Sequence, residues 1–431
     1  MGINVSKKDA GFPINLYFSL MLLSFIPFIY TLVRTNLIAD VPLTDGLGIA
    51  GHIEWFDLIN ETIQAFLIVP LFGLFNKCVQ GTRDFKERAF QLFLIANGIY
   101  ILFSAIIFVR CKFIVTVMTA DQTYKVTKYL QLETIGFIVA NAVSFANVLF
   151  VVLGKTVYIY AIIVLKTVLT IFGDLFWIPQ FGVNGIAYSN IAVSSACVIL
   201  CLFAIYRERL MVISFRFIRT FVKDYAWIGL FSGSQVLLDN IIYTTIVCKM
   251  VNQVSEQGNY WAANNIIWGL MLIPISALSE IIKKECQNEL STAKIKGYHL
   301  IIIVTFFSWL CFIPMLNPFL KNIMGLKEFK TVKHIIMVLI PFYLAYSYTA
   351  LLDSLLIGYG KTQYLFFISG IVNLIYYPIV YGLVLKGIFV PNILFICIMF
   401  GSGMVIHLCC SVIYFILHTK KRKTIFLQAK R

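Results

Sequence analysis

The sequence predicts an all-α integral membrane protein of twelve transmembrane helices, arranged as two pseudo-symmetric lobes of six. Three observations lead to this fold class. The chain of 431 residues is 60% hydrophobic and only 13% charged, with a mean hydropathy of +0.87, and a soluble protein of this length has too little interior to bury so much apolar surface. Apolar runs long enough to span a bilayer recur along the whole chain. A short motif, Gly-Lys-Thr-x-Tyr, occurs at Gly154 and again at Gly360, which indicates an internal duplication.

Each spanning helix needs about 20 predominantly apolar residues. The twelve segments that meet this requirement cover residues 14–38, 48–73, 89–110, 128–153, 157–178, 183–206, 225–249, 259–282, 299–320, 333–357, 363–386 and 391–417. The two copies of the motif follow the fourth and the tenth segments. Because six segments separate the copies, the two halves have the same orientation, and an axis along the membrane normal relates them.

The repeated motif is interpreted as a pair of cytoplasmic turns. A phosphate-binding loop needs a glycine five positions before the second glycine, and Leu149 and Leu355 stand there instead. The glycine of each copy ends a helix, and the lysine lies at the membrane surface. Asn147 of the first half corresponds to Asp353 of the second.

The distribution of charge predicts the membrane topology, and the cysteines predict which covalent and metal sites to expect. The formal net charge is +15, and Lys and Arg are concentrated in segments that are cytoplasmic if the N-terminus is inside. We therefore expect both termini to be cytoplasmic in the plasma (inner) membrane, and no nucleic-acid partner. The ten cysteines include no CxxC pair, which predicts neither a disulfide framework nor a zinc site. The expected domains are an N-terminal lobe, a basic cytoplasmic linker, a C-terminal lobe and a basic cytoplasmic tail, over residues 1–206, 207–224, 225–417 and 418–431.

The second segment carries an unusual set of polar residues. Spacings of three and four place Glu54, Asp57 and Glu61 on one helical face, beside Asn60. Bare carboxylates are costly in hydrocarbon, so protonation or a cation must neutralise them. Arg34, near the end of the first segment, is the nearest candidate cation. One interpretation is an ion pair that only fixes helix packing, and the other is that these residues line a substrate cavity.

Further ionisable residues lie in the fourth and fifth segments. Glu133 is near the start of the fourth segment and is interpreted as interfacial. Lys166 and Asp174 are eight residues apart on one face of the fifth segment. They either pair through another helix, or Lys166 extends its ammonium group to the membrane surface.

Several stretches resemble the multidrug and toxic compound extrusion (MATE) transporters. Residues 33–50, VRTNLIADVPLTDGLGIA, resemble the exit of the family's first helix, and residues 260–266, YWAANNI, resemble the start of its eighth. Residues 179–190, PQFGVNGIAYSN, and 353–360 also fit. The resemblance spans nearly the whole chain. Flippases for polysaccharide precursors and lipid-linked oligosaccharides share this superfamily and its layout.

The resemblance implies a MATE-like fold and roles for acids in the C-terminal half. Asp239 in the seventh helix, next to Gln235, and Asp353 in the tenth match acids that take part in sodium or proton coupling. Asn264 and Asn265 at the start of the eighth helix supply further oxygen atoms for a small hard cation. The alternative is that each acid only hydrogen-bonds a neighbouring helix.

One position departs from the family pattern. Arg34 stands where the family has an acid on the first helix, which puts a cation site there in doubt.

The function expected from these features is a cation-coupled antiporter that exports organic, cationic or amphipathic substrates by alternating access. Na⁺ or H⁺ is the transported coupling ion, and we expect no other cofactor, no catalytic residues, no resident metal, and a monomer in the lipid bilayer. The sequence leaves three alternatives open: a lipid-linked oligosaccharide flippase, a membrane enzyme, and a transport-inactive receptor. A flippase needs a cationic cleft to match pyrophosphate, and the acids of the second segment argue against it.

Overall fold

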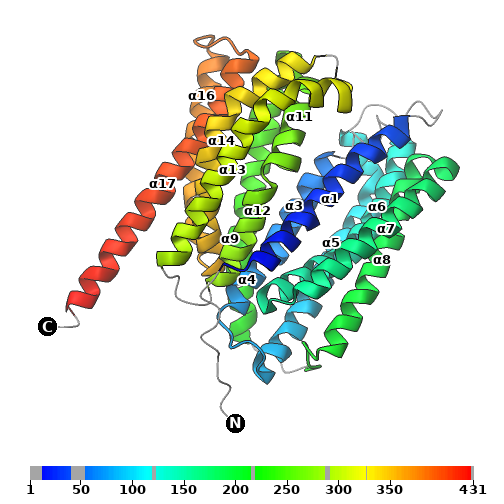
Figure 1. Ribbon diagram of the computed structural model, residues 1–431, viewed down its shortest axis with the longest axis vertical. Helices are drawn as coiled ribbons and strands as arrows, with labels where there is room; N and C mark the ends of the chain where they lie inside the picture. Colours follow the sequence, from blue (N-terminus) through cyan, green and yellow to red (C-terminus); the bar gives the residue numbers. More distant parts are fainter. Residues whose placement is uncertain are drawn as a thin grey trace. The chain divides into compact units, whose positions relative to one another are not determined.

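The structure is a computed structural model that describes residues 12–39, 54–118, 123–214, 219–286, 292–326 and 328–428. Throughout these residues the chain forms α-helices, short π-helical segments and the turns between them (Figure 1). The side chains of Arg34 and Glu54 lie outside the described residues, so the predicted pairing of Arg34 with Glu54 or Asp57 stays a prediction.

The contacts within the chain divide it into two compact units. The unit that we call the N-terminal unit comprises Leu22–Asn240 and Tyr359–Gln363, and the C-terminal unit comprises Met1–Met21, Ile241–Gly358 and Tyr364–Arg431. The lobes expected from the sequence were 1–206 and 225–417. The units differ from those lobes in three places. The start of the first helix belongs to the C-terminal unit. Most of the seventh helix and the turn with the second copy of the repeated motif belong to the N-terminal unit.

The N-terminal unit is a helical bundle. Its helices are α1 (Ile14–Ala39) from Leu22 onward, α3 (Glu54–Leu67), α4 (Pro70–Phe75), α5 (Arg83–Met118), α6 (Thr123–Leu153), α7 (Thr156–Phe181), α8 (Val183–Arg207) and α9 (Arg219–Ile242) up to Asn240. Helices α5 to α8 lie side by side (Figure 1). Gly185 permits the closest approach of α7 and α8, since a Cβ there would stand 2.4 Å from the carbonyl oxygen of Trp177. Small residues of this kind allow tight helix packing in membranes.

The second spanning segment is broken near its middle. Helix α3 ends at Leu67, and α4 begins with Pro70, which has no N–H to donate and is favoured at the first turn of a helix. The N–H groups of Ile68 and Val69 both donate to the Gln64 carbonyl oxygen, at 2.7 and 3.4 Å. Because two N–H groups donate to one carbonyl oxygen, carbonyl groups that follow Gln64 in α3 lack their usual helical donors.

The C-terminal unit contains the other helices. They are α10 (Lys249–Gln253), α11 (Gln257–Ile266), α12 (Ile273–Glu285), α13 (Thr292–Pro318), α14 (Phe329–Gly358), α15 (Thr362–Gly370) from Tyr364 onward, α16 (Tyr377–Leu385) and α17 (Ile393–Gln428). Four π-helical segments interrupt them: η1 (Tyr243–Cys248), η2 (Ile267–Met271), η3 (Phe319–Ile323) and η4 (Ile371–Tyr376). Such segments are frequent at functional sites. The apolar pattern of the sequence gives no sign of them.

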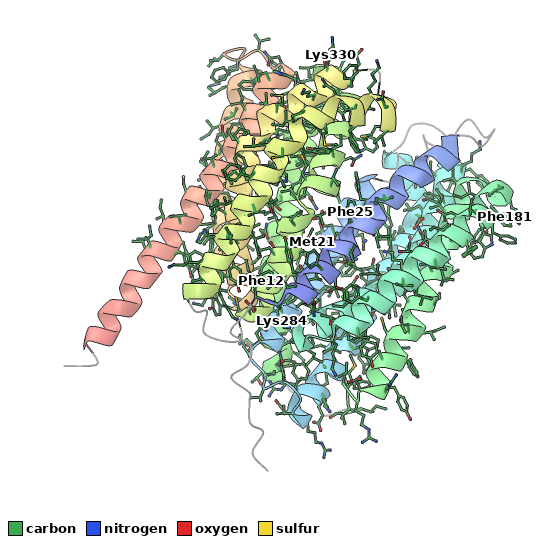
Figure 2. The ribbon with its side chains drawn as sticks, viewed as in Figure 1. Phe12, Met21, Phe25, Phe181, Lys284 and Lys330 are labelled. Atoms are coloured by element: carbon green, nitrogen blue, oxygen red, sulfur yellow. The ribbon has the colours of Figure 1, made fainter. Side chains whose placement is uncertain are left out.

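The first part of α1 packs in the C-terminal unit. The Tyr17 hydroxyl donates to the carbonyl oxygen of Pro274 at 3.2 Å, and the Phe12 ring contacts the rings of Tyr17 and Tyr298. Figure 2 labels Phe12 at the beginning of this helix and Met21 and Phe25 further along it. The boundary between the units therefore lies inside one continuous helix.

Where the structure describes them, the twelve predicted spanning segments coincide with helical parts of the chain, and residues 48–53 of the second segment lie outside the described residues. Within the described residues, nine helices are long and apolar enough to cross a membrane, and a tenth span is formed by the pair Gly258–Met271 and Ile273–Glu285, which is bent by 50°. The first helix qualifies only as a shorter apolar helix over Ile14–Ile29. Helix α9 is not among these spans, and its C-terminal half contains the polar residues Gln235, Asp239 and Asn240. The chain is therefore a multi-pass membrane protein.

Both copies of the repeated motif form turns, as predicted. Gly154 and Gly360 have φ of +66° and +67°, the left-handed region that favours glycine after a helix. In the first copy, Lys155 Nζ lies 2.5 Å from Glu208 Oε2. In the second copy, Thr362 is fully buried, and its hydroxyl donates to the Ile228 carbonyl oxygen at 2.8 Å. The two turns share a backbone shape and differ in what they contact.

Candidate functional site

A cavity of about 250 Å³ lies inside the N-terminal unit. Helices α1, α6, α7 and α8 supply its lining residues, which are Leu23, Ile26, Pro27, Glu133, Gly136, Phe137, Ala140, Ile163, Lys166, Thr167, Thr170, Asn190, Val193 and Ser194. Its walls combine aliphatic side chains with one acid, one lysine and several hydroxyl and amide groups. This mixture is typical of small-molecule sites, where a few polar groups orient a ligand in an apolar pocket.

Glu133 is the buried acid of this cavity. Its residue is only 4% exposed, and the side-chain amide of Asn190 donates to both carboxylate oxygens, at 2.9 and 3.2 Å. A buried carboxylate is tolerated only when hydrogen bonds or charges compensate its lost hydration. The interfacial interpretation of Glu133 is therefore wrong. The signal that could have revealed it is Asn190, which lies in the segment that resembles the family.

Lys166 lines the same cavity, and Asp174 lies two turns further along α7 with no exposed surface. Phe181, labelled in Figure 2, marks the end of this helix. The cavity thus contains both signs of charge, a lysine from α7 and a carboxylate from α6. The sequence placed Lys166 and Asp174 correctly on one helix but gave no reason to join either one to Glu133.

Helix α3 contributes a second polar cluster, on its contact with α5. The Tyr100 hydroxyl donates to Asn60 Oδ1 at 2.6 Å, and the Gln64 amide approaches the same oxygen at 3.5 Å. Asp57 is exposed, and its charge acts on the Tyr100 hydroxyl. Asn60 therefore has a packing role that its assignment to a substrate cavity did not foresee.

Glu61 and the polar residues of α9 form a third cluster. Glu61 lies within hydrogen-bonding reach of Asn240 and close to Asp239. Asn240 Nδ2 also donates to Leu58 O and Thr62 Oγ1, both at 3.2 Å. The structure thus brings together Glu61, assigned to the substrate cavity, and Asp239, assigned to cation coupling.

The carboxylate of Asp239 has a close partner on its own helix. Gln235 Nε2 donates to Asp239 Oδ2 at 2.5 Å, one turn away. Both side chains are half-buried within the N-terminal unit. The structure therefore joins Gln235 and Asp239 by a hydrogen bond, while their role in coupling stays a prediction.

The other predicted coupling residues lie in the C-terminal unit. Asp353 Oδ2 is 3.3 Å from Nε2 of His407 on α17, and the two side chains are 19% and 16% exposed. Asn264 Nδ2 donates to the Tyr243 hydroxyl at 2.9 Å, whereas Asn265 is exposed. Sequence reasoning missed His407, because a lone histidine in an apolar segment 54 positions away carries no local signal.

In the part of the chain that the structure describes, no group of three or more His, Cys, Asp or Glu side chains is arranged to hold a metal ion. Several described acids instead have a single basic or imidazole partner, as in Lys155–Glu208 and His407–Asp353.

Comparison with known proteins identifies the fold. No protein-family model matches the sequence, and no curated protein matches it either. Solved structures do match. They include an outward-facing multidrug resistance MATE family transporter of the MOP superfamily, with 14% identity, a TM-score of 0.81, and coverage of 96% of this chain and 98% of that one.

Two further structures give the same result. A variant of the Vibrio cholerae MATE transporter VcmN has 12% identity, a TM-score of 0.79 and 96% coverage of both chains. A MOP superfamily transporter from Pyrococcus furiosus, described as having a binding pocket of reversed polarity, has 13% identity, a TM-score of 0.77, and coverage of 95% of this chain and 96% of that one. The expected twelve-helix architecture is confirmed, and the chain has the fold of the multidrug and toxic compound extrusion transporters.

Proposed function

We propose that the protein is a secondary transporter of the MOP superfamily that exports organic substrates by alternating access, in exchange for Na⁺ or H⁺. The observation that carries this proposal is the fold, which matches a MATE transporter over 96% of the chain with a TM-score of 0.81. In this proposal the protein is a monomer in the plasma membrane with both termini cytoplasmic, it needs no cofactor, and it catalyses no covalent chemistry.

The ionisable groups within the spanning helices support the transport role. Charged side chains in membrane helices are costly, and they mark ion or substrate pathways when they face a cavity. Glu133 is a buried acid on such a cavity, and Glu61 of α3 and Asp239 of α9 belong to one polar cluster with Gln235 and Asn240. Each of these carboxylates can exchange a proton or a monovalent cation, which is what ion coupling requires.

A second function is favoured by one specific observation. Lys166 places a positive charge on the wall of the cavity, beside Glu133. A lysine there suits an anionic substrate, such as the pyrophosphate of a lipid-linked oligosaccharide, better than a cationic drug. The flippase alternative therefore stays in place beside the exporter.

A transport assay separates the two functions. The full-length protein is reconstituted in proteoliposomes, and export of the fluorescent organic cation ethidium is followed under an imposed Na⁺ gradient and, separately, an imposed H⁺ gradient. The exporter proposal expects ethidium movement that depends on one of the two gradients. Translocation of a fluorescent lipid-linked oligosaccharide without any gradient, together with no ethidium movement, would favour the flippase.

The Lys166→Met variant sharpens the comparison. Removal of the ammonium group leaves the cavity with only the negative charge of Glu133, so cation export should persist or rise. Translocation of a pyrophosphate substrate should fall about tenfold or more, since a charged hydrogen bond contributes about 1.5–3 kcal/mol.

A further inference from the structure

Helix α9 is docked on the break in the second spanning segment, and both partners belong to the N-terminal unit. We call this contact the α3–α9 latch and define it by Tyr225, Gly229, Ser232 and Gly233 of α9 and Ala65, Phe66 and Leu67 of α3. By the sequence repeat, α9 comes from the second half of the chain and α3 from the first. The latch therefore joins the two repeats.

The break in the helix supplies acceptors for the latch. In a regular helix the carbonyl oxygens of residues 65, 66 and 67 would accept from the N–H groups of residues 69, 70 and 71. Here Val69 donates to Gln64, Pro70 has no N–H, and Leu71 donates to Ile68 at 3.1 Å. The carbonyl groups of Ala65, Phe66 and Leu67 are thereby released from the helical pattern.

Hydroxyl groups of α9 satisfy two of these carbonyl groups. The Ser232 hydroxyl donates to Ala65 O, and the Tyr225 hydroxyl donates to Leu67 O, both at 2.7 Å. The donors are 1% and 3% exposed, respectively. Each of these bonds replaces a backbone hydrogen bond that the break in α3 has removed. The latch therefore satisfies carbonyl groups that would otherwise be buried without a donor.

Two glycines allow the backbones to approach. A Cβ at Gly229 would stand 2.4 Å from the Phe66 carbonyl oxygen, and a Cβ at Gly233 would stand 2.1 Å from Cγ of the Phe66 ring. Gly229 and Gly233 form a G-x-x-x-G pattern, which presents a flat surface for close helix contact in membranes. The Phe66 side chain occupies the space that Gly233 leaves open.

A second element from the same repeat supports α9. The turn Tyr359–Gln363 belongs to the N-terminal unit, although α14 and the rest of α15 belong to the other unit. Its Thr362 hydroxyl donates to Ile228 O of α9, and a Cβ at Gly360 would stand 3.7 Å from Gly73 of α4. Immediately after the unit boundary at Asn240, α9 ends and the π-helical segment η1 begins. π-helical segments are one of the recognised causes of sharp helix kinks.

We propose that the α3–α9 latch is a releasable contact of the transport cycle, and this inference rests on the proposed function as a transporter. In the state described here, α9 is hydrogen-bonded to α3 on the predicted cytoplasmic side, and the two helices are held together. In the alternate state, the hydroxyls of Tyr225 and Ser232 exchange their carbonyl acceptors for water, and Phe66 leaves the groove at Gly233. Hydroxyl–carbonyl bonds suit this role, because water replaces them at small net cost.

The first test is a reversible cross-link. In Phe66→Cys with Gly233→Cys, the thiols are within reach of a disulfide, because the Phe66 ring carbon already lies where the new side chain would stand. Ethidium export in proteoliposomes is measured in the reduced and oxidised protein. The latch predicts that oxidation stops export and that dithiothreitol restores it. Equal export in both states would overturn the proposal.

A matched pair controls for oxidation and for cross-linking as such. Gly401 of α17 and Phe342 of α14 have the same interlocking geometry inside the C-terminal unit, with the Phe342 ring carbon 2.2 Å from the position of a Cβ at Gly401. Both helices belong to one repeat, so their contact is not expected to open. Phe342→Cys with Gly401→Cys should transport equally well before and after oxidation. The single variants Phe66→Cys and Gly233→Cys cannot form the new disulfide, so any effect of oxidation on their export comes from the native cysteines or from the single new thiol.

A second test needs no substrate. Spin labels are placed by cysteine substitution at Val79 and Leu230, which are 73% and 52% exposed, with the exposed Cys311 and Cys409 replaced by serine. Distances between the labels are measured in nanodiscs. The latch predicts a second, longer distance whose population rises about tenfold in Tyr225→Phe with Ser232→Ala, the effect expected for two lost hydrogen bonds. A single unchanged distance in both proteins would show that the contact is static.

The outcomes distinguish a failure of the latch from a failure of the proposed function. If the wild-type protein moves no ethidium under either gradient, the export proposal fails for this probe, and the distance measurement alone decides on the latch. If ethidium moves and the oxidised Phe66→Cys, Gly233→Cys protein moves it equally well, the transporter proposal stands and the latch is wrong.

Discussion

In the pair Glu133–Asn190, hydrogen bonds from the amide compensate a buried carboxylate for its lost hydration. The amide of Asn190 donates to both oxygens of a carboxylate that is 4% exposed. Asn190→Leu keeps the side-chain volume and removes both donors. We expect a loss of about 1–3 kcal/mol in the free energy of unfolding, the cost of an unsatisfied buried polar group.

Thermal unfolding in detergent measures this effect. Ser195→Ala on the same helix is the matched control, because its hydroxyl donates only to Ile191 O of its own turn. That variant should stay within about 0.5 kcal/mol of the wild type. A similar small change in Asn190→Leu would show that other neighbours of Glu133 carry the compensation.

The first copy of the repeated motif contains an ion pair with a predictable pH dependence. Hydrogen bonds from Lys155 and Tyr158 lower the pKa of Glu208 below its ordinary value of 4.5. Since the folded-state pKa is depressed, the stabilisation is fully present above the unfolded pKa and is lost as the pH falls through the folded-state pKa. The turn at Gly154 is thus held at neutral pH and released in acid.

The prediction concerns the difference between the wild type and Glu208→Gln. At pH 7 the wild type should unfold at a higher temperature, and the difference should disappear as the pH falls below 4.5. Salt should weaken the effect, because the pair is partly exposed, with side chains 38% and 31% accessible. A difference that persists in acid would mean that packing of the Glu208 side chain, rather than its charge, supports the turn.

Among the described helices, the contact of α3 with α9 is tightly packed and sensitive to side-chain size. A Cβ at Gly233 would overlap the Phe66 ring, at 2.1 Å from Cγ. Gly233→Ala should therefore lower the free energy of unfolding by about 1–3 kcal/mol, as overpacking does. Adding Phe66→Ala should recover part of that loss, because the two changes act on one contact and are not additive.

Gly98 of α5 provides the control for this prediction. A Cβ there meets no atom within 4 Å, so Gly98→Ala should be neutral or stabilise the helix by up to about 1 kcal/mol. Equal effects of the alanine substitutions at 98 and 233 would contradict the interlocked geometry at α3–α9.

Element positions were largely predictable from the sequence, and their irregularities were not. Runs of about 20 apolar residues located all twelve helical spans, because hydrocarbon thickness sets their length. The break at Pro70 and the four π-helical segments depend on neighbouring helices that replace lost backbone bonds, and a single segment does not encode its neighbours. Glu133 was misplaced for the same reason: its tolerance in the interior depends on Asn190, 57 residues away.

At the scale of the whole molecule, the duplication predicted the two equivalent turns but not their different uses. Gly154 and Gly360 share one backbone conformation, yet only the second turn buries its threonine against α9. A repeat fixes local structure because the local sequence is the same. Contacts between repeats depend on residues that differ, such as Tyr225 and Ser232, and these give the molecule its asymmetry.

The proposed ion coupling belongs to the scale of the whole molecule, and Asp239 is the residue at which it can be tested. Its carboxylate accepts a hydrogen bond from Gln235 and lies close to Glu61, so two acids share one polar cluster. Two carboxylates in one polar cluster are a candidate site for a small hard cation. Asp239→Asn keeps the oxygen that Gln235 needs and removes the charge.

We expect Asp239→Asn to fold and to exchange ethidium across the membrane at equilibrium, but to lose accumulation driven by a Na⁺ or H⁺ gradient. Gradient-driven export should fall at least tenfold, since an ion that no longer binds cannot transmit its free energy to the substrate. Asp353→Asn tests the second assigned acid in the same way, with His407→Gln as its partner control, because the two side chains are 3.3 Å apart. If Asp239→Asn exports ethidium against its gradient as well as the wild type does across the pH range, Asp239 is only a packing residue. Coupling would then have to depend on other acids, with Glu133 and Asp353 the first to examine.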